Sequence, residues 1–100
     1  MKVMITGGKT AAALKMLKRF DLAEIVLADY GEVPAFPSKA YSFISLGELN
    51  KDITAHVLLT CCLDHQVNAI LPMNDFERSA LSKSTVLFEE FGVVILEAED

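Results

Sequence analysis

Apolar residues occur along the chain either in short continuous runs or in longer stretches with helical spacing. The short runs, which have the length and composition of strands, cover residues 3–5, 24–29, 41–45, 69–71 and 93–96. The stretches with apolar residues three or four positions apart, which predict helices, cover residues 11–20, 48–66 and 75–91. Pro34 and Pro37 exclude a regular helix between the second and third strands. The predicted order is strand, helix, strand, loop, strand, helix, strand, helix, strand.

The continuous apolar centre of the second strand, Ile25–Ala28, is typical of a parallel sheet that is covered on both faces. With right-handed crossovers, we expect an α/β fold, a Rossmann-like open parallel sheet of about five strands in the order 3-2-1-4-5 with three helices. The two later helices would cover one face, and the other would receive only the first helix and the proline-containing loop. We therefore expect this thinly covered face to be buried against another domain or a second copy of the chain.

Local patterns predict where the helices begin and which sides are buried. Thr10 is expected to cap the first helix, whose buried side would carry Ala13, Leu14, Leu17 and Phe20. In the third helix the buried side would carry Phe76, Ala80, Leu87 and Phe91. Asn74 and Glu77 have the spacing of a capping box at the start of that helix, and Gly92 would end it.

Composition indicates a single compact domain over residues 1–100. The chain is 52% hydrophobic and 23% charged, with a net charge of −5 and scattered basic residues, so the basic surface of a nucleic-acid binder is absent. No apolar run approaches the roughly 20 residues of a membrane span, and the run after Lys2 is too short for a signal peptide. We expect a cytoplasmic domain without a nucleic-acid or membrane partner.

Cysteine and histidine residues give no sign of a metal site. Cys61 and Cys62 are neighbours in a predicted helix, where their side chains diverge, so they are expected to pack as small hydrophobes rather than form a disulfide. His56 and His65 have no acidic or cysteine partner at the spacing of metal ligands. No metal is predicted.

The turns after the first and second strands are the first candidates for chemistry, because ligands gather at the carboxyl ends of parallel strands. Gly8-Lys9-Thr10 copies the end of a phosphate-binding P-loop, but Val3 stands where its first glycine is needed, so the cradle is not expected. Asp29 follows the second strand, where a dinucleotide fold places the acid that binds a ribose hydroxyl, although the G-x-G-x-x-G spacing is missing. Ribose binding and simple capping of the next turn both stay open.

Other catalytic arrangements find no support. Thr6, Gly7 and Gly8 stand where a phosphorylation receiver needs acidic residues after its first strand. Neither cysteine lies at a strand-to-helix turn, and no Ser-His-acid set can be placed. No catalytic residue is predicted.

Three stretches together resemble the N-terminal domain of ATP-grasp enzymes, the pre-ATP-grasp domain, and most of all its carbamoyl-phosphate synthase-like group. They read VMITGGKTAAALKMLKRF, IVLADYGEVPAFPSKAYSFISL and NAILPMNDFERSALSKSTVLFEEFGVVIL. The resemblance rests on their combination: a glycine turn after the first strand, Asp29 after the second, Ser38-Lys39 before an aromatic strand, and Leu-Pro-x-Asn-Asp-x-Glu after the fourth.

The resemblance implies an ATP-dependent ligase that activates a small-molecule carboxylate as an acyl phosphate and couples it to an amine, a thiol or a similar nucleophile. ATP and Mg²⁺ would bind in a C-terminal ATP-grasp domain of the same protein, which is expected to be absent from this chain. The chain alone would then hold no cofactor and be inactive. A second copy of the chain, in a homodimer, is a further expected partner. The alternative is a free-standing Rossmann-type module that binds a nucleotide or another protein.

By position, the resemblance places two turns at the edge of the domain that faces the ligase cleft. The candidates for binding substrate or nucleotide are Gly7, Gly8, Lys9, Asp29, Asn74, Asp75 and Glu77. For Asn74 and Glu77, capping of the helix and contact with a ligand both stay open.

Overall fold

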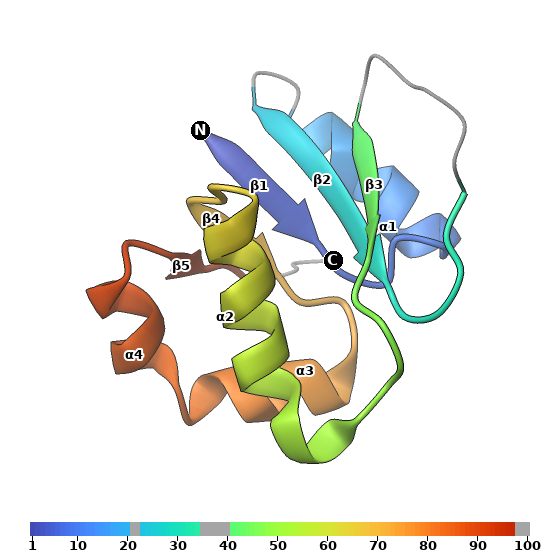
Figure 1. The fold of residues 1–100 in the computed structure, drawn as a ribbon. Coiled ribbons are helices and arrows are strands. Elements are labelled where there is room, and N and C mark those ends of the chain that lie inside the picture. The colour runs from blue at the N-terminus through green and yellow to red at the C-terminus, as the bar shows by residue number, and fades with distance from the viewer. Residues whose placement is uncertain (21–22, 35–40, 98–100) are drawn as a thin grey trace.

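The structure, a computed structural model, describes residues 1–20, 23–34 and 41–97, which form a five-stranded parallel sheet with helices on both faces (Figure 1). The strands are β1 (Lys2–Ile5), β2 (Glu24–Asp29), β3 (Ser42–Ser45), β4 (Ala69–Leu71) and β5 (Val94–Ile95). Their order is β3-β2-β1-β4-β5, so the expected order and the Rossmann-like class are confirmed. The order reverses between β1 and β4, which pair in parallel with Met4 opposite Ile70.

The described residues contain four α-helices instead of three. They are α1 (Ala11–Met16), α2 (Thr54–Asp64), α3 (Asp75–Ser82) and α4 (Thr85–Glu90), with short 3₁₀ helices at Leu17–Phe20 and Lys51–Ile53. The expected helix over residues 75–91 breaks before Thr85, because Lys83 and Ser84 donate their N–H groups only three residues back. The Thr85 hydroxyl also donates to the Leu81 carbonyl. Such bonds tighten and end a helix.

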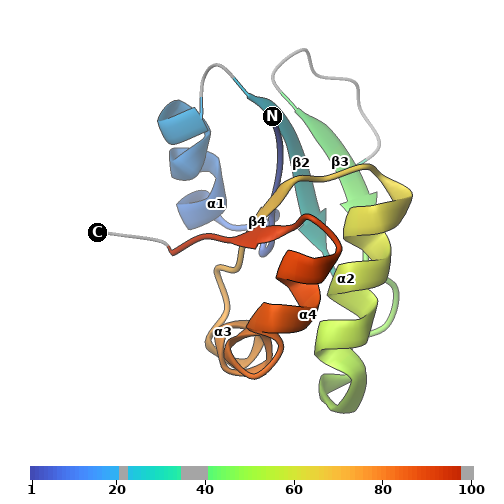
Figure 2. The ribbon, with the colours of Figure 1, turned by 90° about the vertical axis from the view of Figure 1, so that its left-hand side faces the viewer.

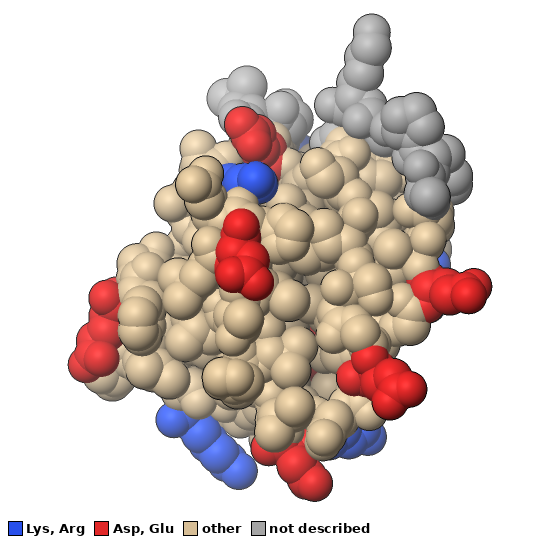
Figure 3. All heavy atoms as spheres, viewed as in Figure 1, with Lys and Arg blue, Asp and Glu red and all other residues tan. Residues whose placement is uncertain are grey.

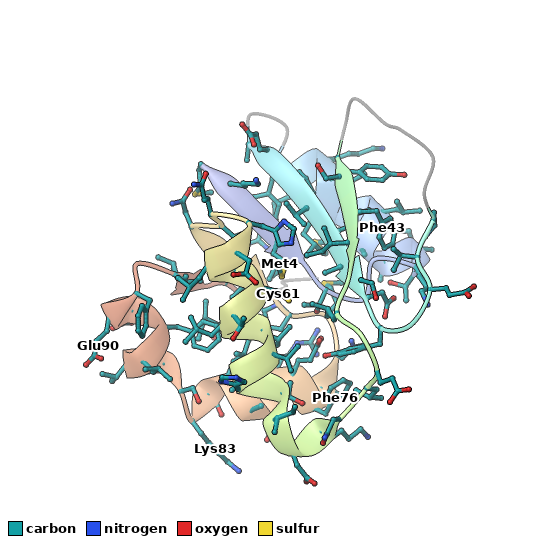
Figure 4. All side chains as sticks on the ribbon, viewed as in Figure 1. Met4, Phe43, Cys61, Phe76, Lys83 and Glu90 are labelled. Atoms are coloured by element: carbon teal, nitrogen blue, oxygen red, sulfur yellow. The ribbon has the colours of Figure 1, made fainter. Side chains whose placement is uncertain are left out.

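The two faces of the sheet bury separate groups of side chains (Figure 2). What we call the α1 face packs β1, β2 and β4 against α1 and the 3₁₀ turn after it, through Val3, Ile5, Ala13, Ile25, Leu27 and Leu71. The opposite, three-helix face packs the sheet against α2, α3 and α4, through Met4, Val26, Leu58, Cys62, Ile70, Leu81 and Phe88. Figure 4 shows Met4 on the side of the sheet that α2 covers.

Two expected helix faces are corrected by the structure. In α1, Leu14 is 45% exposed, and Met16 packs on the sheet in its place. In α3 and α4, Leu87 and Phe91 are exposed, while the buried side chains are Glu77, Leu81 and Phe88. Each buried residue lies one position after an expected one, because the buried stripe includes an acidic residue that hydrophobic periodicity alone leaves outside.

The thinly covered part of the α1 face also lies elsewhere than expected. Ile25–Ala28 of β2 are all buried within the chain, and Tyr41 and Phe43 pack beside them. The open part is over β4 and β5, where Val94 is 55% exposed. Val93 and Ile95 pack on the three-helix face, so the alternation along a strand turns Val94 to the α1 side. The expected proline-containing loop lies partly at residues 35–40, outside the described residues.

The cysteines of α2 behave as the sequence predicts. Both are free thiols, and Cys62 is fully buried in the three-helix core. Burial, with a smaller contribution from Cys61, raises the pKa of Cys62 to about 12, which keeps it a neutral thiol. Among the described residues, no helix is long and apolar enough to cross a membrane.

Candidate functional site

The predicted site residues gather where β1, β2 and β4 end, at the carboxyl edge of the sheet. Gly7 follows β1 with a left-handed φ of +63°, a conformation that costs a residue with a side chain free energy. It packs against the β4–α3 connection, since a Cβ on Gly7 would lie 3.4 Å from the Cβ of Met73 and 3.7 Å from Oδ1 of Asn74. The turns after β1 and β4 are therefore in contact.

Gly8 lies against the sheet itself. A Cβ at this position would lie 2.9 Å from the Cβ of Leu27, 3.0 Å from Cζ of Phe43 and 3.1 Å from the backbone nitrogen of Ala28. The absence of a side chain therefore allows Gly8 to approach the sheet closely. Strands β2 and β3 fill the space, not the following helix or a ligand.

Hydrogen bonds of Lys9 and Asp29 link the turn after β1 to the turn after β2. The Lys9 backbone N–H donates to Oδ2 of Asp29 (3.1 Å), and the Tyr30 N–H donates to Oδ1 (2.8 Å). The Lys9 ammonium donates to the Tyr30 carbonyl (2.7 Å). These contacts explain an acidic residue at position 29 as a cap of the two turns, so a bound ribose is not needed to explain it. They also engage the Lys9 ammonium, which a bound phosphate would need.

The expected capping box at Asn74 and Glu77 is wrong. The Asn74 backbone has extended N-cap dihedrals, but its side chain makes no capping bond. Its amide instead donates to Oε1 of Glu77 (2.8 Å), and the Glu77 side chain is fully buried.

Glu77 accepts two further hydrogen bonds, from the ends of β1 and β2. The Thr6 hydroxyl donates to Oε1 (2.6 Å), and the Tyr30 hydroxyl donates to Oε2 (2.7 Å). Thr6 Oγ1 in turn accepts the Met73 N–H (2.8 Å). We call Thr6, Tyr30, Asn74 and Glu77 the Glu77 cluster. It unites three turns that lie far apart in the sequence.

In the Glu77 cluster, one carboxylate accepts hydrogen bonds from three uncharged donors and has no cationic partner among the described residues. Within the described ranges, the one ion pair joins Arg78 to Asp75 (2.7 Å) on the surface, so it does not include Glu77. Burial, followed by the hydrogen bond and charge of Glu77, raises the pKa of Tyr30 above its ordinary value. The Tyr30 hydroxyl therefore stays protonated and can donate.

Aromatic contacts extend this edge toward the three-helix side. The ring of Phe76, at the start of α3 (Figure 4), lies 5.9 Å from that of Tyr30. The Lys51 ammonium lies 5.1 Å from the centre of the Phe76 ring, a cation–π arrangement. Sequence reasoning missed Thr6, Tyr30 and Lys51 as members of the site. Their one signal is position, because Thr6 and Tyr30 directly follow strand ends.

A crevice of about 1130 Å³ lies on the other side of the edge, between α1 and the β4–α3 connection. It borders the point where the strand order reverses, the usual ligand position in such sheets. Lys15, Met16, Met73, Arg78, Leu96 and Glu97 are among its lining residues. The crevice thus combines apolar walls with two cationic side chains and one anionic side chain. The sequence analysis did not identify Lys15 or Arg78.

The charged side chains on the face shown in Figure 3 do not gather into a further candidate site. On the face shown in Figure 3, lysine and arginine side chains are dispersed among acidic ones. Over the described parts of the chain, no three histidine, cysteine or acidic side chains gather as metal ligands do.

No protein-family model matches the chain, and no curated protein matches it. Among solved structures, it is similar to the dTDP-glucose 4,6-dehydratase of Bacillus anthracis, determined in complex with NAD. The TM-score is 0.58 at 13% identity, over 97% of this chain and 36% of the dehydratase chain. The chain thus spans about a third of the length of that enzyme, and at this identity the similarity concerns the fold alone. The similar solved structure and the strand order of the sheet both indicate a Rossmann-like α/β fold.

Proposed function

We propose that the chain is the substrate-side N-terminal domain of an ATP-grasp ligase, of the carbamoyl-phosphate synthase-like group, that works through an acyl phosphate. One observation carries this proposal: three of the four features on which the sequence resemblance rests meet at one edge of the sheet, while the fourth, Ser38-Lys39, lies outside the described residues. The Gly7-Gly8 turn, Asp29 and the segment from Asn74 to Glu77 are linked there by hydrogen bonds or direct packing. A shared edge is what a cleft-facing surface requires.

The crevice beside this edge supports a small-molecule carboxylate as the ligand. Arg78 already donates to the carbonyls of Pro72 and Met73 and pairs with Asp75. Lys15 is exposed and lines the crevice, so its ammonium is the cation that we assign to the carboxylate. ATP and Mg²⁺ belong, in this proposal, to the ATP-grasp domain of the same polypeptide.

A free-standing nucleotide-binding module is the less supported alternative. NAD is bound by the dehydratase whose fold is similar, but here the acid at the end of β2, Asp29, accepts hydrogen bonds from two backbone N–H groups. The space next to Gly8 is filled by β2 and β3. A dinucleotide would have to displace these contacts.

Two measurements test the proposal. Calorimetry of residues 1–100 with Mg-ATP should show no appreciable binding, because the Lys9 ammonium is engaged and Val3 stands where the P-loop-like turn needs its first glycine. Tight binding would contradict the ligase assignment and favour the nucleotide module. In the natural polypeptide that contains this sequence, ADP release should depend on a carboxylate, and hydroxylamine should trap the acyl phosphate as a hydroxamate.

The role of Lys15 has a matched control. Lys15→Met should raise the KM for the carboxylate about tenfold or more with little change in kcat, since it removes one charge-assisted contact from binding. Lys18→Met, on the same helical stretch but outside the residues that line the crevice, should leave KM unchanged. Equal effects of the two substitutions would remove the crevice from the proposal.

A further inference from the structure

The Glu77 carboxylate receives hydrogen bonds from three different turns. Thr6 follows β1, Tyr30 follows β2, and Asn74 precedes α3. They donate over 2.6, 2.7 and 2.8 Å. Thr6 and Tyr30 are 71 and 47 residues away from Glu77 in the sequence. The two strand-end turns thus reach the β4–α3 connection through one buried side chain.

The chemistry of the cluster requires an acceptor at position 77. Thr6 Oγ1 already accepts the Met73 N–H, so its own proton points to Glu77. The Asn74 amide nitrogen can only donate, and Tyr30 is kept protonated. An ionised carboxylate accepts at both oxygens and donates nowhere. Glutamine can keep an oxygen for Thr6 and Asn74, but its NH₂ group then faces the Tyr30 hydroxyl, so an isosteric change removes at least the bond that Tyr30 donates.

We infer that Glu77 is a positioning residue that holds the three turns of the carboxyl edge together as one unit. The turn after β1 packs on Met73 and Asn74 through Gly7. The turn after β2 is tied to Lys9 through the Tyr30 carbonyl and Asp29. A change at Glu77 therefore moves the Gly7-Gly8 turn, the Tyr30 turn and the Met73 wall of the crevice together. That these turns face a ligand rests on the proposed function; the coupling between them does not.

Amide hydrogen exchange of the 100-residue protein, followed by NMR, tests the coupling. In Glu77→Gln, exchange at Met73, Gly8 and Lys9 should quicken together by about tenfold or more, the effect of losing roughly 1.4 kcal/mol of local stability. Asp75→Asn is the matched control, because its carboxylate is exposed and meets only Arg78. If Glu77→Gln affects Met73 alone, or behaves as Asp75→Asn does, the inference is overturned.

Titration of tyrosinate absorbance adds a readout that general loosening does not mimic. Because Glu77 contributes to the raised pKa of Tyr30, Glu77→Gln should lower this pKa and Asp75→Asn should leave it unchanged. An unchanged Tyr30 titration in folded Glu77→Gln would contradict the contact. If Glu77→Gln fails to fold, Tyr30→Phe takes its place, since it removes one donor and keeps the carboxylate. Coupling then requires faster exchange at Met73 as well as at Lys9, and an effect at Lys9 alone would refute it.

These experiments need neither substrate nor ATP. A negative result would remove the coupling and leave the ligase proposal standing, whereas a lack of ligase activity in the natural polypeptide would leave the coupling intact.

Discussion

Gly8 has the most crowded surroundings of any glycine in the chain, with three atoms at 3.1 Å or less from the position of an added Cβ. One is a backbone nitrogen of β2, which cannot move without disturbing the sheet. Its φ is not in the left-handed region, so a side chain here meets a steric barrier and not a conformational one. Substitution at Gly8 therefore isolates packing between the first turn and the sheet.

We predict that Gly8→Ala lowers the free energy of unfolding by about 1–3 kcal/mol, the usual cost of overpacking, and that Gly8→Val costs more. Gly47→Ala is the control, because an added Cβ there has open space within 4 Å and pays only for its φ of +82°, about 1 kcal/mol. Urea unfolding of the three variants measures this. A Gly8→Val protein as stable as the parent would mean that the turn does not press on β2.

For single residues, the sequence predicted which positions belong to the site better than it predicted the role of each side chain. Thr10 caps α1 as expected, its hydroxyl accepting the Ala13 N–H, because an N-cap depends only on neighbouring residues. Glu77 misled the analysis, since the capping-box spacing is local while its partners Thr6 and Tyr30 come from distant strands. Side-chain contacts over such sequence distances are not encoded in any short pattern.

At the scale of helices and strands, the presence of each element was easier to predict than the side of each helix that is buried. All five strands and the order of elements follow from the positions of apolar runs and prolines. The buried side of α3 and α4 was predicted one residue too early, because Glu77 was expected to cap the helix or contact a ligand and not to join the core. The break between α3 and α4 was missed, since it depends on the hydrogen bonds that the Ser82 and Thr85 hydroxyls donate to backbone carbonyls.

The corrected helix face gives a paired prediction. Phe88→Ala should lower the free energy of unfolding by about 3–5 kcal/mol, the usual cost of removing a fully buried ring. Phe91→Ala removes the same atoms from a side chain that is 53% exposed and should cost about 1 kcal/mol or less. Thermal or urea unfolding of both variants decides between the two faces. The reverse ranking would restore the face expected from periodicity.

For the whole molecule, strand order followed from right-handed crossovers, a rule that applies to the sheet as a whole, and from the prolines between the second and third predicted strands. The location of the uncovered surface did not follow, because it depends on which aromatic side chains fold over β2. Phe43 lies opposite Leu27 in the sheet and covers that side. The opening falls over β4 and β5, next to the crevice and Val94.

We predict that this opening is a contact surface and that the 100-residue protein associates with a second copy through it at high concentration. Val94→Asp should weaken association about tenfold or more, because it places a charge in an apolar contact. Val86→Asp, at a 68% exposed position on α4, is the control and should have no effect. Light scattering over a concentration series measures both. A protein that stays monomeric throughout would show that the surface is not used between copies.

The Glu77 cluster also limits how this sequence can change over evolutionary time. Its members come from three separate places in the sequence, and each donor contributes to stability only while the acceptor is present. Loss of the carboxylate alone leaves the buried Thr6 hydroxyl and the half-buried Tyr30 and Asn74 donors without their acceptor, which costs more than an apolar replacement of the whole set. Descendant sequences should therefore keep Thr6, Tyr30, Asn74 and Glu77 together or exchange them together. A comparison of related sequences should therefore show these four positions varying together.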